Sequence, residues 1–218
     1  MVIAAAMLCA SVGIAQAQAR PSLVSAAGTI ASGDHALVVT LDGQVLLPAL
    51  MLGYRYGAAD WLELGIDVGA SVGLFQSFAQ AKAAIYRSPG ERIFVGARLY
   101  SGYKIHDYEI GSIIADDNSW GSAIEPSLAV RFGDRKRRAL YFSALFYVDF
   151  DLRSPRRQTD LYLLPAIVGF ESLIGTRFNF YVEAGLALSL NGTETPKGVL
   201  YAGDAFPVVK AGLAWRIP

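Results

Sequence analysis

Residues 140–152 read LYFSALFYVDFDL, and this stretch decides the fold. Every second residue from Leu140 to Leu152 is apolar, whereas the intervening face ends in Asp149 and Asp151. Because successive side chains of a β-strand point to opposite faces, the stretch is one strand with two very different surroundings. Strands of soluble proteins usually run for about five or six residues, whereas a tilted strand needs about nine to eleven to cross a membrane. The stretch therefore predicts a transmembrane β-barrel.

The same alternation recurs along the chain. It is clear in residues 62–72 and 178–190, and it is noisier in six further segments, at about 46–57, 75–87, 91–105, 122–133, 160–172 and 206–217. Short polar turns separate some of these segments, and longer breaks at about 106–121, 153–159 and 191–205 separate others. Short turns at one end of a barrel and long loops at the other are typical of outer-membrane barrels.

The number of strands follows from parity. The segments above number nine, and bacterial single-chain barrels have an even number of strands, so a tenth strand is expected before residue 46. The candidate is His35–Leu41, followed by a turn at Asp42-Gly43. The sequence therefore predicts an all-β, antiparallel, up-and-down barrel of ten strands. Eight strands is the alternative, if noisy segments merge or are lost.

The composition and the N-terminus agree with an exported barrel. The 218 residues suit one domain, and beyond residue 20 no apolar run is long enough for a membrane-spanning helix, although 53% of the residues are hydrophobic. The net charge of zero gives no reason to expect nucleic acid as a partner. Residues 1–19 are predicted to be a cleaved signal peptide with A-x-A sites before residue 20, although no basic residue precedes its apolar stretch. The barrel domain would then span residues 20–218, and an uncleaved anchor helix is the alternative.

The last strand carries a motif that resembles the C-terminal assembly signal of bacterial outer-membrane proteins. Lys210 is followed by Gly212, and Trp215 and Ile217 lie three and five residues after that glycine. The motif differs in its end, because such chains commonly finish on an aromatic residue and this one finishes on Pro218. From about residue 23 onward, the chain resembles small outer-membrane barrels of the OmpA, OmpX and OmpW type. The resemblance implies the Gram-negative outer membrane, its lipids and the barrel-insertion machinery as surroundings.

A soluble barrel is the alternative to a membrane barrel. Its apolar faces would have to fill the interior and its charged faces would meet water. The thirteen-residue strand and the terminal motif both favour the membrane barrel, in which the apolar faces meet lipid. Aromatic residues on those faces gather near the short turns, as an interfacial girdle does. They are Tyr54, Tyr56, Phe132, Phe170, Phe178, Phe180 and Trp215.

Charged residues within the strands are then expected to point into the lumen, because a basic side chain at mid-membrane on the lipid face costs about 2–4 kcal/mol. Parity assigns seven basic and seven acidic residues to the inside. The basic residues are Arg55, Lys82, Arg98, Lys104, Arg131, Lys210 and Arg216. The acidic residues are Glu63, Asp67, Glu125, Asp149, Asp151, Glu171 and Glu183.

Equal numbers of both signs in a narrow barrel predict an occluded, charge-paired lumen, because buried charges need partners. The predicted role is accordingly structural, or one of adhesion or surface interaction. A narrow, porin-like channel for small solutes is the alternative, although a selective pore would more plausibly carry one sign in excess.

An enzyme is the third interpretation. His106 begins a predicted outer loop that also carries Asp107, Glu109, Asp116 and Asp117, and this group could position a general base. No nucleophile motif accompanies it, so we predict no catalytic residues. Residues 116–118 lack the spacing of a cation loop, and no pattern indicates a metal or cofactor. In another outer loop, Arg153, Arg156 and Arg157 could contact lipopolysaccharide phosphates.

Overall fold

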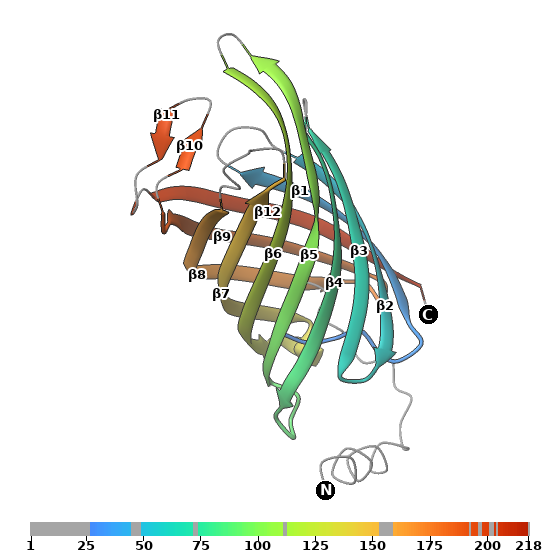
Figure 1. The fold of residues 1–218 in the computed structure, drawn as a ribbon. Helices are drawn as coiled ribbons and strands as arrows, with labels where there is room; N and C mark the ends of the chain where they lie inside the picture. The colour runs from blue at the N-terminus through green and yellow to red at the C-terminus, as the bar shows by residue number, and fades with distance from the viewer. Residues whose placement is uncertain are drawn as a thin grey trace, which may run out of the picture.

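The chain forms a closed antiparallel β-barrel in a computed structural model (Figure 1). The structure describes residues 27–44, 49–71, 74–110, 113–152, 159–191, 193–195, 198–200, 203 and 205–217. The barrel strands are β1 His35–Gln44, β2 Ala49–Ala59, β3 Leu62–Ser71, β4 Leu74–Arg87, β5 Ile93–Ile110, β6 Ile113–Phe132, β7 Arg138–Asp151, β8 Thr159–Ile174, β9 Phe178–Ser189 and β12 Ala205–Ile217.

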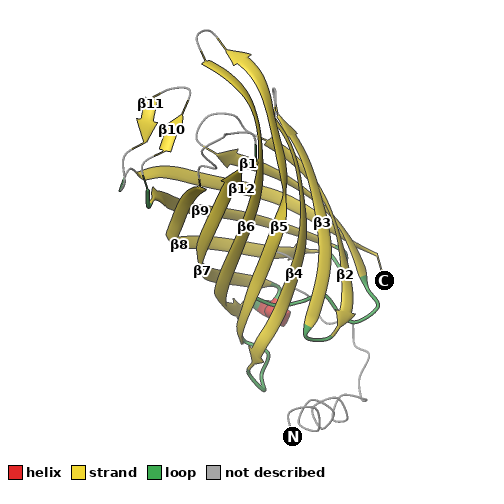
Figure 2. Ribbon diagram, viewed as in Figure 1, coloured by secondary structure: helices red, strands yellow, loops and turns green. Residues whose placement is uncertain are grey.

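Each barrel strand pairs with its neighbours in the sequence, and β12 closes the barrel against β1. The short strands β10 (Thr193–Thr195) and β11 (Gly198–Leu200) form a separate hairpin between β9 and β12, and the only helical turn of the described residues is η1 (Asp134–Lys136), drawn red in Figure 2. The predicted ten-strand barrel is confirmed, and the eight-strand alternative is wrong. In the described part of the chain, no helix is long and apolar enough to cross a membrane.

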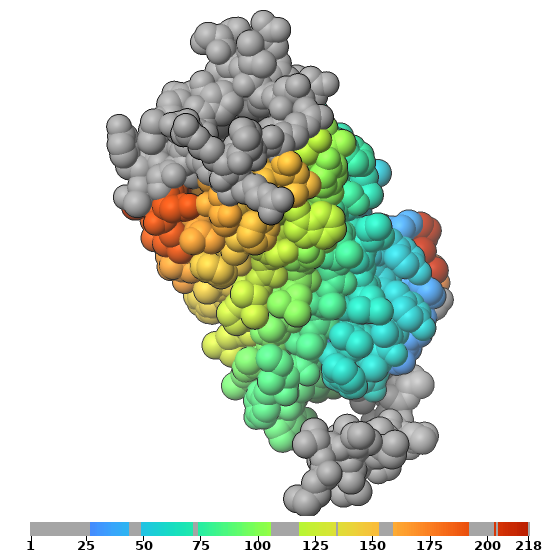
Figure 3. All heavy atoms as spheres, viewed as in Figure 1, coloured from blue at the N-terminus to red at the C-terminus, as the bar shows by residue number. Residues whose placement is uncertain are grey.

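The two ends of the barrel differ. The β2–β3, β4–β5, β6–β7 and β8–β9 turns lie at one end, which we call the short-turn end. The β10–β11 hairpin lies at the opposite end, together with the ends of β5 and β6 at Ile110 and Ile113, and we call it the hairpin end. The side chains of neighbouring strands follow one another in diagonal bands in Figure 3, as the strand tilt of a barrel requires.

Two connections predicted from the sequence are strands instead. Asp42 and Gly43 do not form a turn but belong to β1, where Asp42 lies opposite both Lys210 and Ala49. Nor is the stretch 106–121 a loop, because β5 and β6 continue pairing until Ile110 faces Ile113. A strand that extends beyond a membrane needs no apolar face there. Its sequence can therefore be as rich in charged residues as that of a loop.

The weak alternation of β8 has a local cause. Near Pro165, its pairing with β9 shifts by one residue between Leu163 and Ala166, and its pairing with β7 shifts between Leu164 and Ile167. Leu164 before the shift and Ile167 after it are both buried, so the residues that face inward change from even to odd numbers. A β-bulge of this kind transfers side chains from one face to the other, which makes both faces look apolar when parity is read across it.

The outer face of the barrel is apolar and the inner face is polar. Leu52, Leu99 and Phe142 are each more than half exposed on the outside, as are many other strand residues of the same kind. Sixteen polar or charged residues of the described chain are buried, and those in strands occupy the opposite parity. This arrangement is the reverse of that in a soluble barrel and is the one expected of a barrel surrounded by lipid.

Candidate functional site: the barrel lumen

The fourteen charges predicted for the lumen all lie on the inner face of the barrel. Eight are buried: Arg55, Glu63, Lys82, Glu125, Arg131, Glu171, Glu183 and Arg216. Asp67, Arg98, Lys104, Asp149, Asp151 and Lys210 face the same way but retain partial exposure. The structure brings most of them together in ion pairs or hydrogen bonds, which form several separate groups along the lumen.

The first group joins β2, β3 and β4. Arg55 Nη2 lies 2.7 Å from Asp67 Oδ1, and Lys82 Nζ lies 3.1 Å from Glu63 Oε2. Arg55 Nε is also 3.9 Å from Glu63 Oε1, so the two pairs form one network. Gln80 Nε2 donates to the second Asp67 oxygen at 2.6 Å. Because these charges share partners and lie out of water, the loss of one affects the others.

Two glycines make room for this network. Gly53 lies opposite Asp67 and Gly65 lies opposite Arg55 on the paired strands. A Cβ atom at residue 53 would lie 2.3 Å from Asp67 Oδ1, and one at residue 65 would lie 2.7 Å from Arg55 Cδ. The arginine side chain can lie against the wall because Gly53 and Gly65 have no side chains.

The second group lies on β5, β6 and β7, around Glu125. Arg98 faces Glu125 directly across the β5–β6 pair, with Nε 3.3 Å from Oε2. Ser143 Oγ donates to Glu125 Oε1 at 2.8 Å, and the Tyr100 hydroxyl donates to Oε2. One buried carboxylate thus has a cation and two hydroxyl donors, which offsets the cost of removing it from water.

Three tyrosines fill the lumen by lying over inward-facing glycines. Tyr141 covers Gly169, Tyr147 covers Gly121 and Tyr181 covers Gly212, since a Cβ atom at each glycine would lie within 2.5 Å of an atom of the tyrosine side chain. Tyr141 is fully buried and its hydroxyl donates to Glu183 Oε1 at 2.9 Å. The hydroxyl of Tyr147 donates to Asp149, and the hydroxyls of Tyr181 and Thr40 are hydrogen-bonded to each other.

Toward the hairpin end, the pair Lys104–Asp149 joins β5 to β7. Lys104 Nζ lies 2.7 Å from Asp149 Oδ2 and 4.4 Å from the centre of the Tyr147 ring. The ammonium group therefore has both a carboxylate and an aromatic face as partners. Asp151 lies two residues further along the same face of β7, opposite Ser119.

Asp42 is an inner-face charge that the sequence reasoning missed. It is buried on β1, and its Oδ2 lies 3.6 Å from Nζ of Lys210 on β12. The Asp42-Gly43 dipeptide is typical of turns. The two faces of residues 36–41 alternate regularly, with Ala36, Val38 and Thr40 on one face and Leu37, Val39 and Leu41 on the other. This alternation indicates that the strand continues into Asp42 and Gly43.

The remaining charges lie near the short-turn end. Glu171 accepts a hydrogen bond of 2.5 Å from Asn179 Nδ2, and both side chains are almost fully buried. The Arg131 guanidinium carbon lies 4.5 Å from the centre of the Phe94 ring. Arg216 Nη2 lies 2.8 Å from Asp34 Oδ2, which ties the last strand to the residues that precede β1.

Residues 27–34, before β1, form a segment that closes the short-turn end of the lumen; we call it the N-terminal plug. Ala27 and Ile30 are fully buried, and Ala27 packs with Phe94, Ala129, Ala139 and Tyr141. Ile30 N donates to Glu63 Oε2 at 3.0 Å, so the plug is bonded to the charge network. The sequence reasoning missed this segment because it does not alternate. Its small apolar residues just before a strand were the available signal.

The plug also follows the wall of the barrel closely. Gly33 N donates to Gly57 O at 2.8 Å and Gly57 N donates to Asp34 O at 3.0 Å. A Cβ atom at Gly57 would lie 2.0 Å from Ala31 O, and one at Gly96 would lie 2.4 Å from Ala27 O. The backbone of the plug can approach the wall only because these two wall residues are glycines.

The hairpin-end half of the lumen is lined differently. Ala123, Leu145, Leu164, Ile167, Ala187 and Val208 form an apolar cluster on its wall, and Tyr100, Tyr147 and Phe206 pack against it. Tyr162 lies 6.1 Å from Tyr147 and 6.2 Å from Phe206, measured between ring centres. The lumen is thus filled by apolar and aromatic side chains as well as by the ion pairs that the sequence predicts.

Of the other residues singled out in the sequence, the structure describes those of the C-terminal motif but not those of the predicted signal peptide. Lys210 and Gly212 face inward, whereas Trp215 and Ile217 lie on the outer face of β12, where the Trp215 ring stacks on Phe178 at 6.4 Å. Residues 1–19 and Arg153, Arg156 and Arg157 lie outside the described residues, and so do the side chains of residues 106–117. Among the described residues, no group of His, Cys, Asp and Glu could hold a metal ion.

The inner and outer faces define the class of protein. It is a closed barrel with an apolar outer face, and charged, apolar and aromatic side chains occupy its lumen. No family model and none of the curated proteins matches the sequence. Among solved structures, the chain is similar to OmpT of Vibrio cholerae, at 11% identity and a TM-score of 0.39, over 78% of this chain and 56% of that one. It is also similar to the translocator domain of the autotransporter NalP from Neisseria meningitidis, at 12% identity and a TM-score of 0.31, over 84% of this chain and 88% of that one.

The chain therefore spans little more than half the length of the first of these structures. Similarities at this level say nothing about activity. The narrower resemblance to barrels of the OmpA, OmpX and OmpW type stays a prediction.

Proposed function

We propose that this chain is an integral protein of the bacterial outer membrane, with a non-conducting barrel that serves as a membrane anchor for surface interaction. The observation that carries the proposal is the closed short-turn end of the lumen, where the N-terminal plug meets buried charges. Glu63, Tyr141, Glu171 and Asn179 there are each at most 1% exposed.

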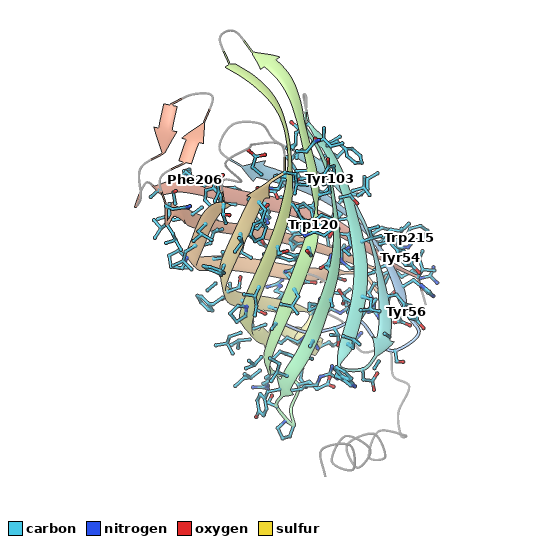
Figure 4. The ribbon with its side chains drawn as sticks, viewed as in Figure 1. Tyr54, Tyr56, Tyr103, Trp120, Phe206 and Trp215 are labelled. Atoms are coloured by element: carbon cyan, nitrogen blue, oxygen red, sulfur yellow. The ribbon has the colours of Figure 1, made fainter. Side chains whose placement is uncertain are left out.

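The membrane part of the proposal is supported by the outer face. Aromatic residues lie at two levels on it, with Tyr54, Tyr56 and Trp215 toward the short-turn end and Tyr103 and Trp120 toward the hairpin end (Figure 4). Tyrosine and tryptophan prefer the two interfaces of a membrane, so the apolar band between these levels corresponds to its hydrocarbon core. The short-turn end then faces the periplasm and the hairpin end faces outward.

The surface part of the proposal is supported by the unequal strand lengths. β5 has 18 residues and β6 has 20, whereas β1 and β3 have 10 each. The pair therefore continues beyond its neighbours, β4 and β7, whose pairing with it ends at His106 and Ser119. A two-stranded projection on the outer side is suited to contact other molecules, and the proposal includes no catalytic step.

Two partners predicted from the sequence are expected for a barrel in the outer membrane. The barrel-insertion machinery would recognise β12, whose Trp215 and Ile217 are accessible from the lipid side. Lipopolysaccharide phosphates would be bound by Arg153, Arg156 and Arg157 on the outer side, since guanidinium groups pair well with phosphates.

A narrow channel is the second candidate. It is favoured by the partial exposure of Lys210 and Asp67, whose side chains retain 26% and 17% of their accessible surface within the lumen. To conduct, such a channel would need the N-terminal plug to leave the periplasmic end.

Fractionation with heat-modifiable gel migration tests the proposal. We expect the protein in the outer-membrane fraction, with the unboiled form migrating differently from the boiled form. A protein that is absent from that fraction, or that migrates identically in both forms, would contradict the proposed location and barrel. Single-channel recording tests separately whether the barrel conducts.

A further inference from the structure

The short-turn end carries an excess of basic side chains, although the whole chain has a net charge of zero. Three successive turns, β4–β5, β6–β7 and β8–β9, contribute them. We call the set the basic collar, and it consists of Arg87, Arg92, Arg135, Lys136, Arg137, Arg138 and Arg177. Between residues 87 and 92 and between 133 and 138, the only acidic residues are Glu91 and Asp134. The local charge is therefore strongly positive.

The turns of the collar are joined to one another. Lys136 Nζ donates to Gly90 O, which links the β6–β7 turn to the β4–β5 turn. Backbone bonds from Arg131 N to Arg92 O, at 2.7 Å, and from Leu173 N to Arg137 O, at 2.8 Å, continue the connection along the rim. Arg92, Arg135, Arg138 and Arg177 remain exposed. The collar is thus one connected surface with guanidinium groups available to a ligand.

The collar lies at the level of the membrane interface. Phe132, which ends β6, and Phe178, which begins β9, are exposed on the outer face. Phe178 directly follows Arg177, and Phe132 lies three residues before Arg135. Aromatic residues of this kind mark the boundary between hydrocarbon and headgroups. The neighbouring guanidinium groups are consequently within reach of the headgroup phosphates.

The β6–β7 turn holds two of these residues in an unfavourable conformation. Arg135 and Lys136 both have φ of 54°, in the left-handed region that glycine occupies most readily. Strained backbone of this kind persists only where the surrounding structure enforces it, and it is concentrated at functional sites. Here it presents adjacent basic side chains in a turn that begins at Gly133, whose own φ is 76°.

We propose that the basic collar binds the headgroup phosphates of anionic phospholipids in the periplasmic leaflet. Arginine forms two parallel hydrogen bonds to a phosphate, and several cations on one surface act together on a negatively charged lipid layer. The proposal rests on the membrane orientation proposed above. The charge of the collar, its connection along the rim and its place beside the lipid-facing aromatics all favour a lipid over a soluble partner.

Binding of phosphatidylglycerol to the purified full-length protein in neutral detergent micelles tests the collar, with phosphatidylcholine as the uncharged comparison. We expect a preference for phosphatidylglycerol that weakens with added salt, because exposed charges are screened. The triple variant Arg135→Gln, Lys136→Gln and Arg138→Gln should lose affinity, on the order of fivefold for each charge removed. The charge-conserving variant Arg135→Lys and Arg138→Lys is the matched control, and it should keep the salt-sensitive preference for phosphatidylglycerol.

Heat-modifiable migration of each variant separates the two proposals. If the wild-type protein shows no heat shift, the membrane barrel itself is contradicted. If all variants show the shift but the collar variant binds phosphatidylglycerol as tightly as the wild type, the collar inference is wrong and the barrel stands. Equal affinity of the wild-type protein for the two lipids would also overturn the collar inference. So would a collar variant that keeps its affinity for phosphatidylglycerol but loses binding to an acidic periplasmic protein.

Discussion

The two halves of the lumen are filled in different ways. In the short-turn half, which is the periplasmic half in the proposed orientation, the N-terminal plug lies against Glu63, and the side chains around it are almost inaccessible to water. In the outer half, apolar and aromatic side chains line one wall, and the ion pairs Lys104–Asp149 and Lys210–Asp42 are reached by water in part. Balanced charge alone therefore does not account for the closed end of this barrel. The least accessible side chains lie where a separate segment of the chain enters the lumen.

The largest effect is expected from Glu63→Ala, in the periplasmic half. The substitution removes the carboxylate that pairs with Lys82 and Arg55 and accepts from Ile30 N. Loss of one member of a buried charge group costs about 3–5 kcal/mol, because the remaining charges stay out of water. Urea unfolding of the barrel in lipid vesicles measures this loss.

The matched control is Glu91→Ala, whose partner Arg87 is on the surface, and its cost should not exceed about 1 kcal/mol. Equal losses for the two variants would remove the distinction between the buried network and the rim.

The next effect is expected from Gly57→Ala, which separates the plug from the wall. The new Cβ atom would lie 2.0 Å from Ala31 O, so the plug has to move, at a cost of about 1–3 kcal/mol. Thr29→Cys, introduced together with it, should become reactive to a water-soluble maleimide, whereas Thr29→Cys alone should be protected. Gly90→Ala is the control, since no atom lies within 4 Å of its Cβ position. Protection that survives Gly57→Ala would show that the plug does not depend on this contact.

The smallest effect is expected from Asp149→Asn, in the outer half. The amide oxygen can still accept from the Tyr147 hydroxyl, and water reaches the pair with Lys104 in part. We therefore expect a loss of about 1 kcal/mol in the free energy of unfolding. The same urea titration as for Glu63→Ala measures it. If this variant is destabilised as much as Glu63→Ala, the two halves of the lumen are equally tight, contrary to the comparison above.

Much of the fold could be predicted because parity is a strong constraint in a barrel strand. The alternation in residues 140–152 establishes β7, and the inward direction of charges such as Arg98 and Glu125 follows from the same count. Their partners could not be predicted, because pairing depends on the register between strands. Arg98 meets Glu125 only because β5 and β6 are aligned so that these two residues are opposite.

The features that were missed lie where parity does not apply. The N-terminal plug crosses the lumen without forming a strand, so its residues do not alternate. The extension of β5 and β6 beyond residues 105 and 122 carries charges that are typical of loops, since no lipid requires an apolar face there. The Asp42-Gly43 dipeptide favours a turn locally, and the long-range pairing of β1 with β12 overrides that preference.

The central claim is that the barrel is closed at its periplasmic end, and single-channel recording in a planar bilayer tests it most directly. The purified wild-type protein, shown by its heat shift to be folded, should give no stable conductance steps at either polarity. Stable, reproducible single-channel steps from the wild-type protein would contradict the closed lumen and would favour the narrow channel instead.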